Sequence, residues 1–412
     1  MNATSNFVFI VGKFPATSET FVLDHVLAMK SAGNIVTVIA ERTENEIAAL
    51  AKLKECGLEN VVKYYDVPKS RFKKMIRSMA GLVVLGKQSP ISTIRLLAEV
   101  CFFAPLSWNY LLIAHATRGM ARKKVTVICH FGPNGLVGAA LCKSGFLHGR
   151  LITIFHGNDV TAYIALKGRN VYQYLFKNGD WLFPVSSYFS ERLGSLGCPP
   201  GKLKVHHVGI DSDSYIFSPR TRYEREITIV TVARLVEKKG HAYMLNAMDL
   251  LKNRGILARY VIVGDGPERL RLEAQARGMD LQDSVEFRGS ATHYEVRQWM
   301  HACDLFVLPS VTAENGDQEG IPVSLMEAMA VGRLVITTRH SGIPELVRDG
   351  ESGFLVQEKD AFGLAEAILR SLVLTAEQRQ EILREARNTI ERDFNACLLN
   401  REFANFVASA AL

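Results

Sequence analysis

The sequence predicts an α/β protein made of two Rossmann-like domains, each with a parallel β-sheet. Its 412 residues exceed the size at which one hydrophobic core keeps growing, which favours two domains. Short apolar runs alternate with longer segments of helical periodicity, as is typical of βαβ units. This alternation stops at one polar stretch and then starts again. We therefore expect two such domains facing each other across a cleft, with ligands at the carboxyl ends of the strands.

The first domain is predicted to cover residues 1–210. Between its first two apolar runs, residues 18–33 have helical spacing and end on a glycine. The apolar runs are continuous, which suits strands of a parallel sheet that is buried on both faces. We predict strands at FVFIVG (7–12), IVTVIA (35–40), TVICHF (126–131), LITIFHG (151–157), WLFPVS (181–186) and KVHHVG (204–209).

Residues 211–226 are polar, contain Pro219 and lack periodicity, so they are the predicted linker. The second domain is predicted to cover residues 227–393. The terminal stretch, residues 394–412, is predicted to be an amphipathic helix that packs on one of the domains. Strands of the second domain are predicted at ITIVTVA (227–233), RYVIVGDG (259–266), SVEFRG (284–289), DLFVLPS (304–310), RLVITT (333–338) and GFLV (353–356).

Cysteine usage and apolar segments point to a cytoplasmic protein. The seven cysteines are scattered and contain no CxxC pair, which favours a reduced compartment over a disulfide scaffold or zinc site. The first residues lack a basic region and have a short apolar run, so they predict a strand and not a signal peptide. The apolar stretch at 96–117 is interrupted by Glu99, Pro105 and Asn109, and we do not expect it to span a bilayer.

Charge is divided unevenly along the chain. Residues 1–210 hold 25 Lys+Arg against 12 Asp+Glu, a balance of +13, and the remaining residues hold 24 against 30, a balance of −6. The basic excess is densest in KSRFKKMIR (69–77) and RGMARKK (118–124), on either side of an apolar and aromatic stretch. This pattern fits either a solvated surface or a face held to an anionic membrane. Nucleic acid is not an expected partner, because no nucleic-acid-binding motif is present.

The stretch EGIPVSLMEAMA holds two glutamates in unusual positions. Pro322 suits the first position of a helix, because its missing N–H would have no partner there. Such a helix would direct backbone N–H groups at a phosphate or diphosphate, and Gly320 would let the backbone approach a ligand. Glu327, on the second helical turn, could accept hydrogen bonds from sugar hydroxyls. The alternative is that Glu327 is a surface residue and Glu319 belongs to a solvated loop.

ARLVEKKG (233–240) follows the first predicted strand of the second domain. Arg234 and Lys239 would stand at the carboxyl end of that strand, where two cations could stabilise a departing diphosphate. The alternative is a charged surface loop, for which Glu237 and Lys238 are the better candidates.

VIVGDGP (261–267) begins like a dinucleotide-binding fingerprint, but Arg269 stands where the third glycine would be. This difference disfavours a nicotinamide cofactor. A turn at Gly264 and Gly266 beside a nucleotide base or ribose is the better functional prediction.

In the first domain, His156 follows the strand LITIF and is itself followed by Gly157 and Asp159, so it is the stronger site candidate. His130 has a similar place one strand earlier, and a packed core histidine is an equal alternative for it. Ser18 and Glu19 could cap the first helix, contact an acceptor, or both. We take Ser18, Glu19, His130 and Asp159 as the candidates for acceptor binding.

Asp211 and Asp213 match the DxD pattern by which some sugar transferases hold a metal. They lie at the predicted linker, so we interpret Asp211 as the end of the VGID turn, and we predict no metal site and no cofactor.

Taken together, these stretches resemble glycosyltransferase family 4, which has the two-domain GT-B architecture. The resemblance covers nearly the whole chain and is strongest from about residue 204 to residue 356. In addition to the stretches above it rests on VGID (208–211), FRG (287–289), DLFVLPS and HSGIPELVRDGESGFLV (340–356). The two glutamates match the E-x7-E motif of that family. SETF near the start and GDQEGIPVSLMEAMA look most like the subgroup that builds colanic-acid-type exopolysaccharides and capsules.

The resemblance implies a role for each matching residue. Glu319 would contact the donor sugar, Glu327 the ribose, and His156 would sit near the reacting sugar. Arg234 and Lys239 would hold the diphosphate, assisted by backbone N–H groups. The other donor-binding positions would be Gly264, Gly266, Arg288, Gly289, Gly320, Ile321 and Val323. The family retains anomeric configuration and usually needs no bound metal.

We therefore expect a cytoplasmic, retaining hexosyltransferase that uses a nucleotide diphosphate sugar, with UDP favoured. It would extend a lipid-linked oligosaccharide at the inner face of the membrane, with exopolysaccharide-assembly proteins as further partners. The alternatives are a GT-B sugar-nucleotide epimerase and a non-catalytic nucleotide-sugar-binding protein. On the expected function, Glu319→Ala abolishes transfer while the protein still folds.

Overall fold

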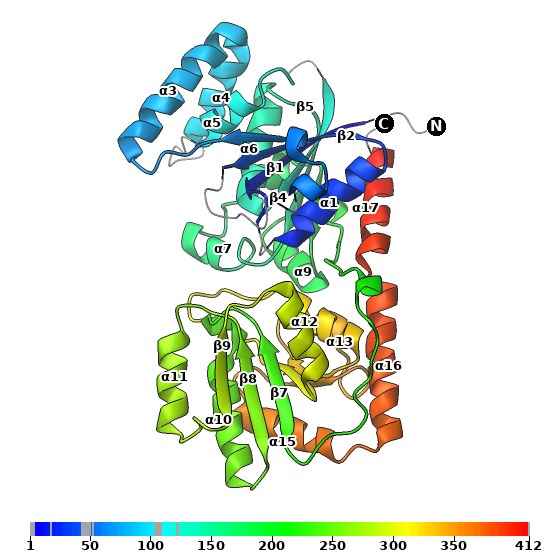
Figure 1. Ribbon diagram of the computed structural model, residues 1–412. Coiled ribbons are helices and arrows are strands. Elements are labelled where there is room, and N and C mark those ends of the chain that lie inside the picture. Colours follow the sequence, from blue (N-terminus) through cyan, green and yellow to red (C-terminus); the bar gives the residue numbers. More distant parts are fainter. Residues whose placement is uncertain are drawn as a thin grey trace. The chain divides into compact units, whose positions relative to one another are not determined.

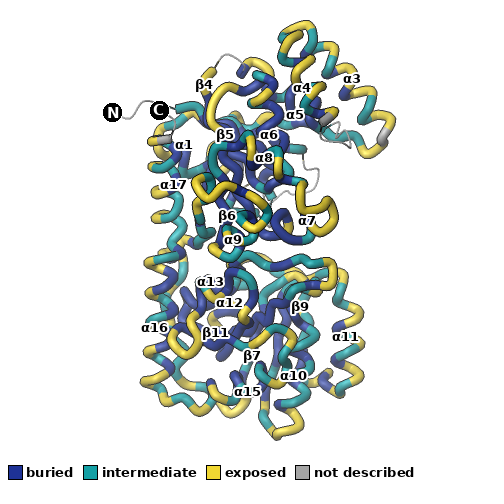
Figure 2. Tube along the Cα trace, turned by 180° about the vertical axis from the view of Figure 1, so that it is seen from behind, coloured by how far each residue is buried: buried dark blue, intermediate teal, exposed yellow. Residues whose placement is uncertain are grey.

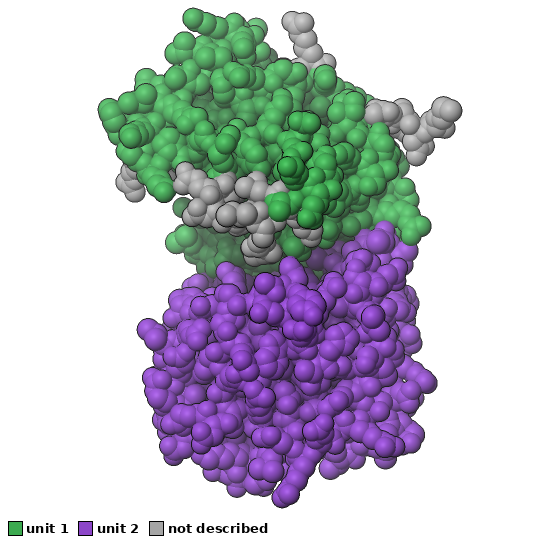
Figure 3. Space-filling model, viewed as in Figure 1, with its two compact units in different colours: residues 1–185, 190–206, 400–412 green, residues 186–189, 207–399 purple. Residues whose placement is uncertain are grey.

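The structure, a computed structural model, describes residues 5–16, 19–42, 51, 53–102, 109–120 and 123–410. The chain forms two compact units, coloured separately in Figure 3. Unit 1 takes residues 1–185, 190–206 and 400–412, and unit 2 takes residues 186–189 and 207–399. Each unit contains one six-stranded sheet, in which every pair of neighbouring strands is parallel.

The sheet of unit 1 has the spatial order β3-β2-β1-β4-β5-β6. The strands are β1 (Asn6–Lys13), β2 (Ile35–Glu41), β3 (Val62–Tyr65), β4 (Lys124–His130), β5 (His148–Phe155) and β6 (Trp181–Pro184). The helices are α1 (Thr20–Ser31), α3 (Arg71–Gln88), α4 (Pro90–Phe102), α5 (Asn109–Ala116), α6 (Gly132–Ser144), α7 (Ala162–Lys167), α8 (Gln173–Asn178) and α9 (Ser187–Ser195), the last of which starts in residues of unit 2. Short 3₁₀ turns lie at Glu59–Val61 and Pro200–Lys202.

The sheet of unit 2 has the order β12-β11-β10-β7-β8-β9. Its strands are β7 (Ile227–Val232), β8 (Ala258–Val263), β9 (Val285–Gly289), β10 (Leu305–Leu308), β11 (Leu334–Thr338) and β12 (Phe354–Val356). Its helices are α10 (His241–Asn253), α11 (Arg269–Gly278), α12 (His293–Ala302), α13 (Val323–Val331), α14 (Ile343–Leu346), α15 (Ala361–Leu372) and α16 (Ala376–Asp393), with 3₁₀ turns at Ser212–Ser214 and Glu237–Lys239.

Successive residues of the central strands enter two separate cores, one on each face of the sheet. In β7, Ile229 joins a cluster with residues of α10, α11 and α15, whereas Val230 joins a cluster with residues of α12, α13 and α16. Both side chains are fully buried, as are most residues along the central strands (Figure 2). This two-sided burial explains why the strands are apolar throughout and do not alternate with polar residues.

The C-terminal helix α17 (Ala396–Ala410) follows α16 at the end of the chain (Figure 1). Its first residues belong to unit 2 and residues 400–412 to unit 1. Within unit 1, Phe403 stacks on His206 with ring centroids 4.8 Å apart, and Phe406 meets Trp181 edge-on at 5.3 Å.

One predicted strand of unit 1 is wrong, and one strand of unit 1 was not predicted. KVHHVG (204–209) is not a strand: the Lys204 and His206 N–H groups donate to Leu182 and Pro184 of β6, but the paired register does not extend. Pro184 has no N–H with which to continue a ladder. Conversely, β3 was not predicted, because VKYY is short and carries a lysine.

Most of the apolar stretch at 96–117 is helical. Residues 90–102 form α4 and residues 109–116 form α5, while residues 103–108 lie outside the described part of the chain. Among the helices that the structure describes, none combines the length and the apolar character needed to cross a bilayer.

Candidate active site

A buried ion-pair cluster in unit 2 surrounds Glu319. Its carboxylate lies 2.7 Å from the Lys239 Nζ and 3.1 Å from the Lys238 Nζ. Lys238 also pairs with Asp317 at 3.0 Å and donates a hydrogen bond to the Gln318 carbonyl. The side chains of Lys238, Lys239 and Glu319 are only 12–13% exposed. The alternative of a charged surface loop does not hold for Lys238, which is as buried as Lys239 and belongs to the cluster.

The two lysines keep Glu319 ionised. Burial alone would raise the pKa of the Glu319 carboxyl, but the Lys239 and Lys238 ammonium groups outweigh it and lower the pKa to about 2. For Lys238 burial opposes the charge as well, and Glu319 and Asp317 together raise its pKa. The cluster is therefore a set of mutually stabilised charges, in which Glu319 accepts hydrogen bonds and does not donate them.

This pKa predicts how stability depends on pH. The pKa of Glu319 is lower in the folded protein than in the unfolded chain, so its contribution to stability is complete above about pH 4.5 and is lost as the pH falls toward 2. The contribution at neutral pH is roughly 3 kcal/mol. We expect the stability difference between wild type and Glu319→Gln, measured by urea unfolding, to be constant from pH 7 to pH 5 and to shrink below that range. A difference that stays constant down to pH 3 would contradict the assigned ionisation.

A histidine fixes the backbone at Glu319. The Glu319 N–H donates to the Nε2 of His340 at 3.0 Å, and the His340 Nδ1 lies 2.6 Å from Glu358. Because Nε2 accepts, the proton of the neutral ring sits on Nδ1 and is donated to Glu358. Glu358 also accepts a hydrogen bond from the Thr312 N–H at 2.7 Å. Neither His340 nor Glu358 was a candidate from the sequence, since nothing along the chain indicates that they meet Glu319.

Helix α13 begins directly after this cluster. Pro322 is the residue before the helix, with φ −67° and ψ 124°, and Val323 is its first residue. The predicted placement of Pro322 inside the helix is thus one residue off. The consequence is the same, because the first N–H groups of an α-helix have no partner within it. Ile321 is buried in the core, whereas Val323 is 36% exposed.

Glu327, two turns into the motif, faces a tyrosine. The Tyr215 hydroxyl donates to the Glu327 carboxylate at 2.6 Å, and the Arg297 guanidinium lies 4.8 Å from the centre of the Tyr215 ring. Burial raises the pKa of Glu327, although Tyr215, His293 and Arg297 reduce the effect. Glu327 is thus neither a fully exposed surface residue nor part of the Glu319 cluster.

The glycines of VIVGDGP serve close packing between two loops. A Cβ added to Gly264 would lie 1.9 Å from the carbonyl oxygen of Ala233, and one added to Gly266 would lie 2.4 Å from that of Leu235. No side chain fits at these contacts, so both glycines bring this turn against the loop that carries Arg234. Arg234 itself is exposed, and its carbonyl accepts a hydrogen bond from His241.

The other predicted donor-binding positions also lie in unit 2. Arg288 pairs with Glu286 at 2.5 Å, and its guanidinium lies 4.8 Å from the centre of the Trp299 ring. The Gly289 carbonyl accepts a hydrogen bond from the Gly264 N–H at 2.8 Å, which joins these two predicted stretches. Gly320 is part of the turn between Glu319 and α13.

Asp159 positions the loop that carries His156 in unit 1. It is 3% exposed, and its carboxylate accepts hydrogen bonds from the N–H groups of Gly157 (2.8 Å), Gly132 (2.9 Å) and His156 (3.0 Å). Burial raises the pKa of Asp159 in spite of these hydrogen bonds. Asp159 therefore holds this loop in place, and its predicted contact with an acceptor stays a prediction.

His156 ends a row of four hydrogen-bonded histidines, which we call the histidine chain. The His156 Nε2 lies 3.0 Å from the His130 Nδ1, the His130 Nε2 lies 3.4 Å from the His25 Nδ1, and the His25 Nε2 lies 3.1 Å from the His206 Nε2. His130 is fully buried, as expected for the packed core histidine that was one of the two alternatives stated for it. His25 and His206 were not candidates from the sequence.

Three further residues were singled out in the sequence: Glu19, Ser18 and Asp211. Glu19 stands at the residue before α1 and its side chain makes no capping hydrogen bond, so its predicted role as a helix cap is wrong, and its contact with an acceptor stays a prediction. Ser18 is outside the described residues. Asp211 caps a 3₁₀ turn by accepting hydrogen bonds from Ser214 Oγ and the Asp213 N–H. Within the described ranges, no three His, Cys, Asp or Glu side chains are grouped to hold a metal ion.

The structure thus groups the E-x7-E and ARLVEKKG residues in unit 2 and the predicted histidines in unit 1. Sequence comparison divides the chain in a similar way. The family described as Glycosyltransferase Family 4 matches residues 18–214, and that described as Glycosyl transferases group 1 matches residues 214–389.

Full-length relatives are found among bacterial polysaccharide proteins. WcaL of Escherichia coli, a glycosyltransferase whose name refers to colanic acid biosynthesis, is 36% identical over 408 residues, covering 97% of this chain and 98% of that protein. The amylovoran biosynthesis glycosyltransferase AmsK of Erwinia amylovora is 32% identical over 406 residues, covering 98% and 99%.

Solved structures share the whole architecture. The crystal structure of HepE from Anabaena, in complex with UDP and glucose, superposes with a TM-score of 0.72 and covers 99% of this chain and 100% of that one. At 17% identity this likeness concerns the fold alone.

Proposed function

Because the chain belongs to glycosyltransferase family 4 and has the GT-B fold, we propose that it moves a hexosyl group from a nucleotide diphosphate sugar to a lipid-linked oligosaccharide. The observation that carries this proposal is the buried Glu319 between two lysines, just before the first turn of α13. Cations and helix N–H groups suit a diphosphate, and an ionised carboxylate suits sugar hydroxyls. The names of WcaL and AmsK support a place in exopolysaccharide biosynthesis.

In this proposal Glu319 acts as an acceptor of hydrogen bonds from the donor sugar. With a pKa of about 2 it is a weak base, so it is a poor candidate to deprotonate the acceptor hydroxyl. Its charge instead suits the positive charge that develops on the sugar ring as the bond to the diphosphate breaks. The leaving diphosphate would then take the proton of the acceptor hydroxyl on the same face, which retains the anomeric configuration.

Lys239 is proposed to stabilise the leaving diphosphate, with Arg234 from the same loop. Among the contacts that the structure describes, Lys239 pairs with Glu319, whereas Lys238 is also held by Asp317. Lys239 would break one ion pair to turn toward a phosphate, whereas Lys238 would break two. Lys239 is therefore the better candidate to bind the phosphate. These cations and the first N–H groups of α13 would neutralise the leaving group, and we propose that transfer needs no bound metal. Transfer that continues in EDTA is the expected result.

A UDP-sugar is the proposed donor, because the structure of HepE, which shares this fold, contains UDP and glucose. We expect UDP to raise the melting temperature by roughly 5 °C at a concentration near 100 times its Kd, and more than GDP or ADP at the same concentration. Lys239→Met serves as the control and should lose most of this shift. A larger shift with GDP or ADP would assign a different base to the donor.

The acceptor is proposed to be reached at the inner face of the cytoplasmic membrane. Helix α3 exposes Phe72, Ile76, Met79 and Val83, each 50–65% exposed, at spacings of 4, 3 and 4 residues that place them along one side of the helix. Lys73, Lys74 and Lys87 lie on the same helix. An apolar side flanked by lysines suits peripheral binding to anionic lipid.

If the apolar side of α3 binds the membrane, polar substitutions on that side should reduce binding to anionic vesicles. We expect Ile76→Ser/Val83→Ser to lower the fraction of protein that sediments with phosphatidylglycerol vesicles at least tenfold, because two apolar side chains no longer enter the interface. Leu270→Ser/Val373→Ser is the matched control, since those side chains are 79% and 81% exposed in unit 2. The proposal fails if wild type stays in the supernatant at low salt, or if both variants lose binding equally.

A further inference from the structure

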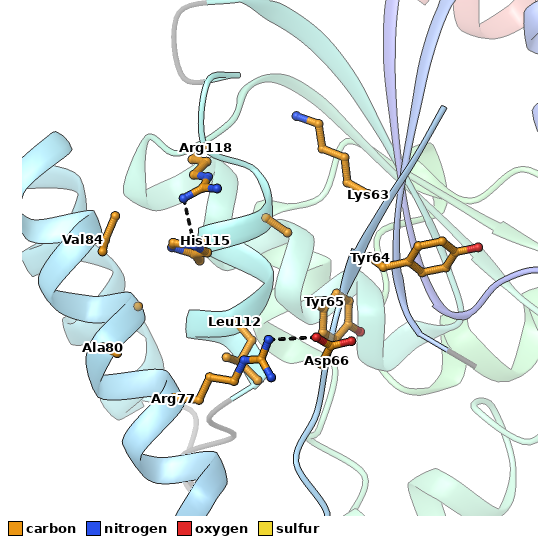
Figure 4. A pocket seen from close by; sticks show the side chains of 12 residues that line it. Lys63, Tyr64, Tyr65, Asp66, Arg77, Ala80, Val84, Leu112, His115 and Arg118 are labelled. Atoms are coloured by element: carbon orange, nitrogen blue, oxygen red, sulfur yellow. Dashed lines mark hydrogen bonds and ion pairs between the residues drawn. The ribbon is translucent and has the colours of Figure 1, made fainter. Parts of the chain in front are cut away.

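Unit 1 contains a cavity that none of the proposed donor or acceptor residues line. It has a volume of about 770 Å³ and lies among β3, α3 and α5 (Figure 4). Its polar lining includes Lys63, Asp66, Arg77, His115 and Arg118. Its apolar lining comes from Ala80, Gly81, Val84 and Leu112, among others.

The cavity has an excess of positive charge. Three of the described lining residues, Lys63, Arg77 and Arg118, are cationic, and Asp66 is the one carboxylate among them. Asp66 is already shared, because it pairs with Arg77 at 2.8 Å and with Arg42 at 3.2 Å. The contact described for the Arg118 guanidinium is with a neutral partner, the Nε2 of His115 at 3.1 Å. An anion entering the cavity would therefore meet cations that its own lining does not neutralise.

His115 adds a hydrogen-bond donor without a partner. A guanidinium can only donate, so the His115 Nε2 accepts from Arg118 and the ring proton sits on Nδ1. That Nδ1 is buried and has no hydrogen-bond partner among the described atoms. Burial lowers the pKa of His115, and Arg118 and Arg77 lower it further, which is consistent with a positive potential at the ring. A buried N–H without an acceptor is costly in itself, and the groups of the lining that an anion can reach are the exposed side chains of Lys63 and Arg118.

Helix α3 joins this cavity to the proposed membrane surface. Arg77, Ala80, Gly81 and Val84 line the cavity, while Ile76, Met79 and Val83, at neighbouring positions, are exposed. One helix thus presents an apolar side for acyl chains and contributes Arg77 to the cavity that would hold a head group. A free phosphate would use only the cavity.

We propose that this cavity binds the phosphate head group of an anionic phospholipid. The inference extends the proposed membrane association, and its test does not depend on glycosyl transfer. The exposed apolar side of α3 could still bind vesicles when the cavity binds no head group. The two proposals, membrane binding by α3 and head-group binding in the cavity, can therefore fail separately.

The test uses lipids that stay monomeric in solution. Calorimetric titration with dihexanoyl-phosphatidylglycerol below its micelle concentration should show one site, at least tenfold tighter than for dihexanoyl-phosphatidylcholine, whose ammonium group opposes the cationic lining. Lys63→Gln/Arg118→Gln should reduce binding of the anionic lipid to the level of the zwitterionic one. Both side chains are exposed, so the variant should fold, which a thermal melt verifies.

Lys143→Gln/Lys167→Gln is the matched control, because it removes the same charge from exposed positions of unit 1 that lie outside both the cavity lining and α3. It should leave lipid binding unchanged. Equal affinity for the two lipids, or equal losses in the two variants, would overturn the proposal. Inorganic phosphate that binds as tightly as the lipid would overturn it too, because the site would then recognise a free anion.

The histidine chain carries a second, independent inference. A neutral imidazole has one N–H, and the two inner rings, His25 and His130, use both nitrogens within the chain. An inner ring that accepts at one nitrogen must donate at the other. All three hydrogen bonds therefore run in the same direction, and the tautomer of His156 is tied to that of His206.

We propose that His25, His130 and His206 are positioning residues that fix which atom His156 presents at its Nδ1. If the protons run toward His156, its Nδ1 is an N–H donor. If they run toward His206, its Nδ1 is a lone-pair acceptor. Burial lowers the pKa of His25, His130 and His156, and the neighbouring histidines lower each pKa further. These three rings are therefore neutral at pH 7, as the single direction of the hydrogen bonds requires.

Imidazole ¹⁵N spectra test this inference directly. We expect either Nδ1–H at His156, His130 and His25 with Nε2–H at His206, or the reverse at all four. A mixed pattern would overturn the inference. His25→Leu should change the tautomer population of His156 and lower kcat, with the donor KM unchanged. Phe403→Leu, which removes a ring stacked on His25 and no hydrogen bond of the chain, should change neither.

Discussion

Glu319→Gln is expected to lower hexosyl transfer by about 10³-fold in kcat. The substitution keeps the size of the side chain but removes the charge that two buried lysines hold in place. Because the interaction would matter most while the sugar carries positive charge, the donor KM should change much less than kcat. Initial rates with a labelled UDP-hexose measure both. A variant that retains a tenth of wild-type turnover would contradict the proposed role.

The same substitution should also cost stability, although the protein should still fold, as is expected from the sequence for Glu319→Ala. Without the carboxylate, Lys239 loses the partner described for it and Lys238 keeps Asp317. We expect a loss of roughly 2–3 kcal/mol in the free energy of unfolding. Adding Lys239→Met should recover most of this loss but none of the activity. Recovery of turnover in the double variant would show that the first defect was one of folding.

Lys239→Met is the change with the second-largest expected effect. Loss of the ammonium group that faces the leaving diphosphate should lower kcat by 10² or more, as an order of magnitude, and weaken UDP binding. Both can be measured, by initial rates and by calorimetry with UDP.

Lys238→Met is the matched control for this second prediction. The two lysines are adjacent and almost equally buried, yet Lys238 contacts Asp317, Glu319 and the Gln318 carbonyl. Its removal leaves two carboxylates short of a cation, so the main loss should be in stability, roughly 3 kcal/mol. If Lys238→Met loses more UDP affinity than Lys239→Met, the two lysines have the opposite roles.

Most strands could be predicted from the sequence, because both sheets are buried on two faces and their central strands are continuous apolar runs. The two errors of strand prediction concern segments for which a continuous apolar run is a poor guide. VKYY of β3 is short and carries a lysine, and KVHHVG runs beside β6 but cannot extend a ladder past Pro184.

The site was predicted where it follows the order of the chain and missed where it depends on folding. His156 directly follows β5, and Lys239 and Glu319 lie on the segments that connect β7 and β10 to the next helices, where ligands are expected. Lys238 could be taken for an exposed residue, because its ion-pair partners Asp317 and Glu319 lie about eighty residues later in the sequence. His340, Glu358, His25 and His206 were missed for the same reason: each has its partners on distant segments.

The anomeric configuration of the product is the sharpest test of retaining hexosyl transfer. Purified protein would be incubated with each of a panel of UDP-hexoses and a lipid-linked oligosaccharide acceptor, and the new linkage examined by ¹H NMR. We expect a linkage with the configuration that the sugar had in the donor, and no linkage with Glu319→Gln. An inverted linkage, or an epimerised nucleotide sugar formed without acceptor, would contradict it.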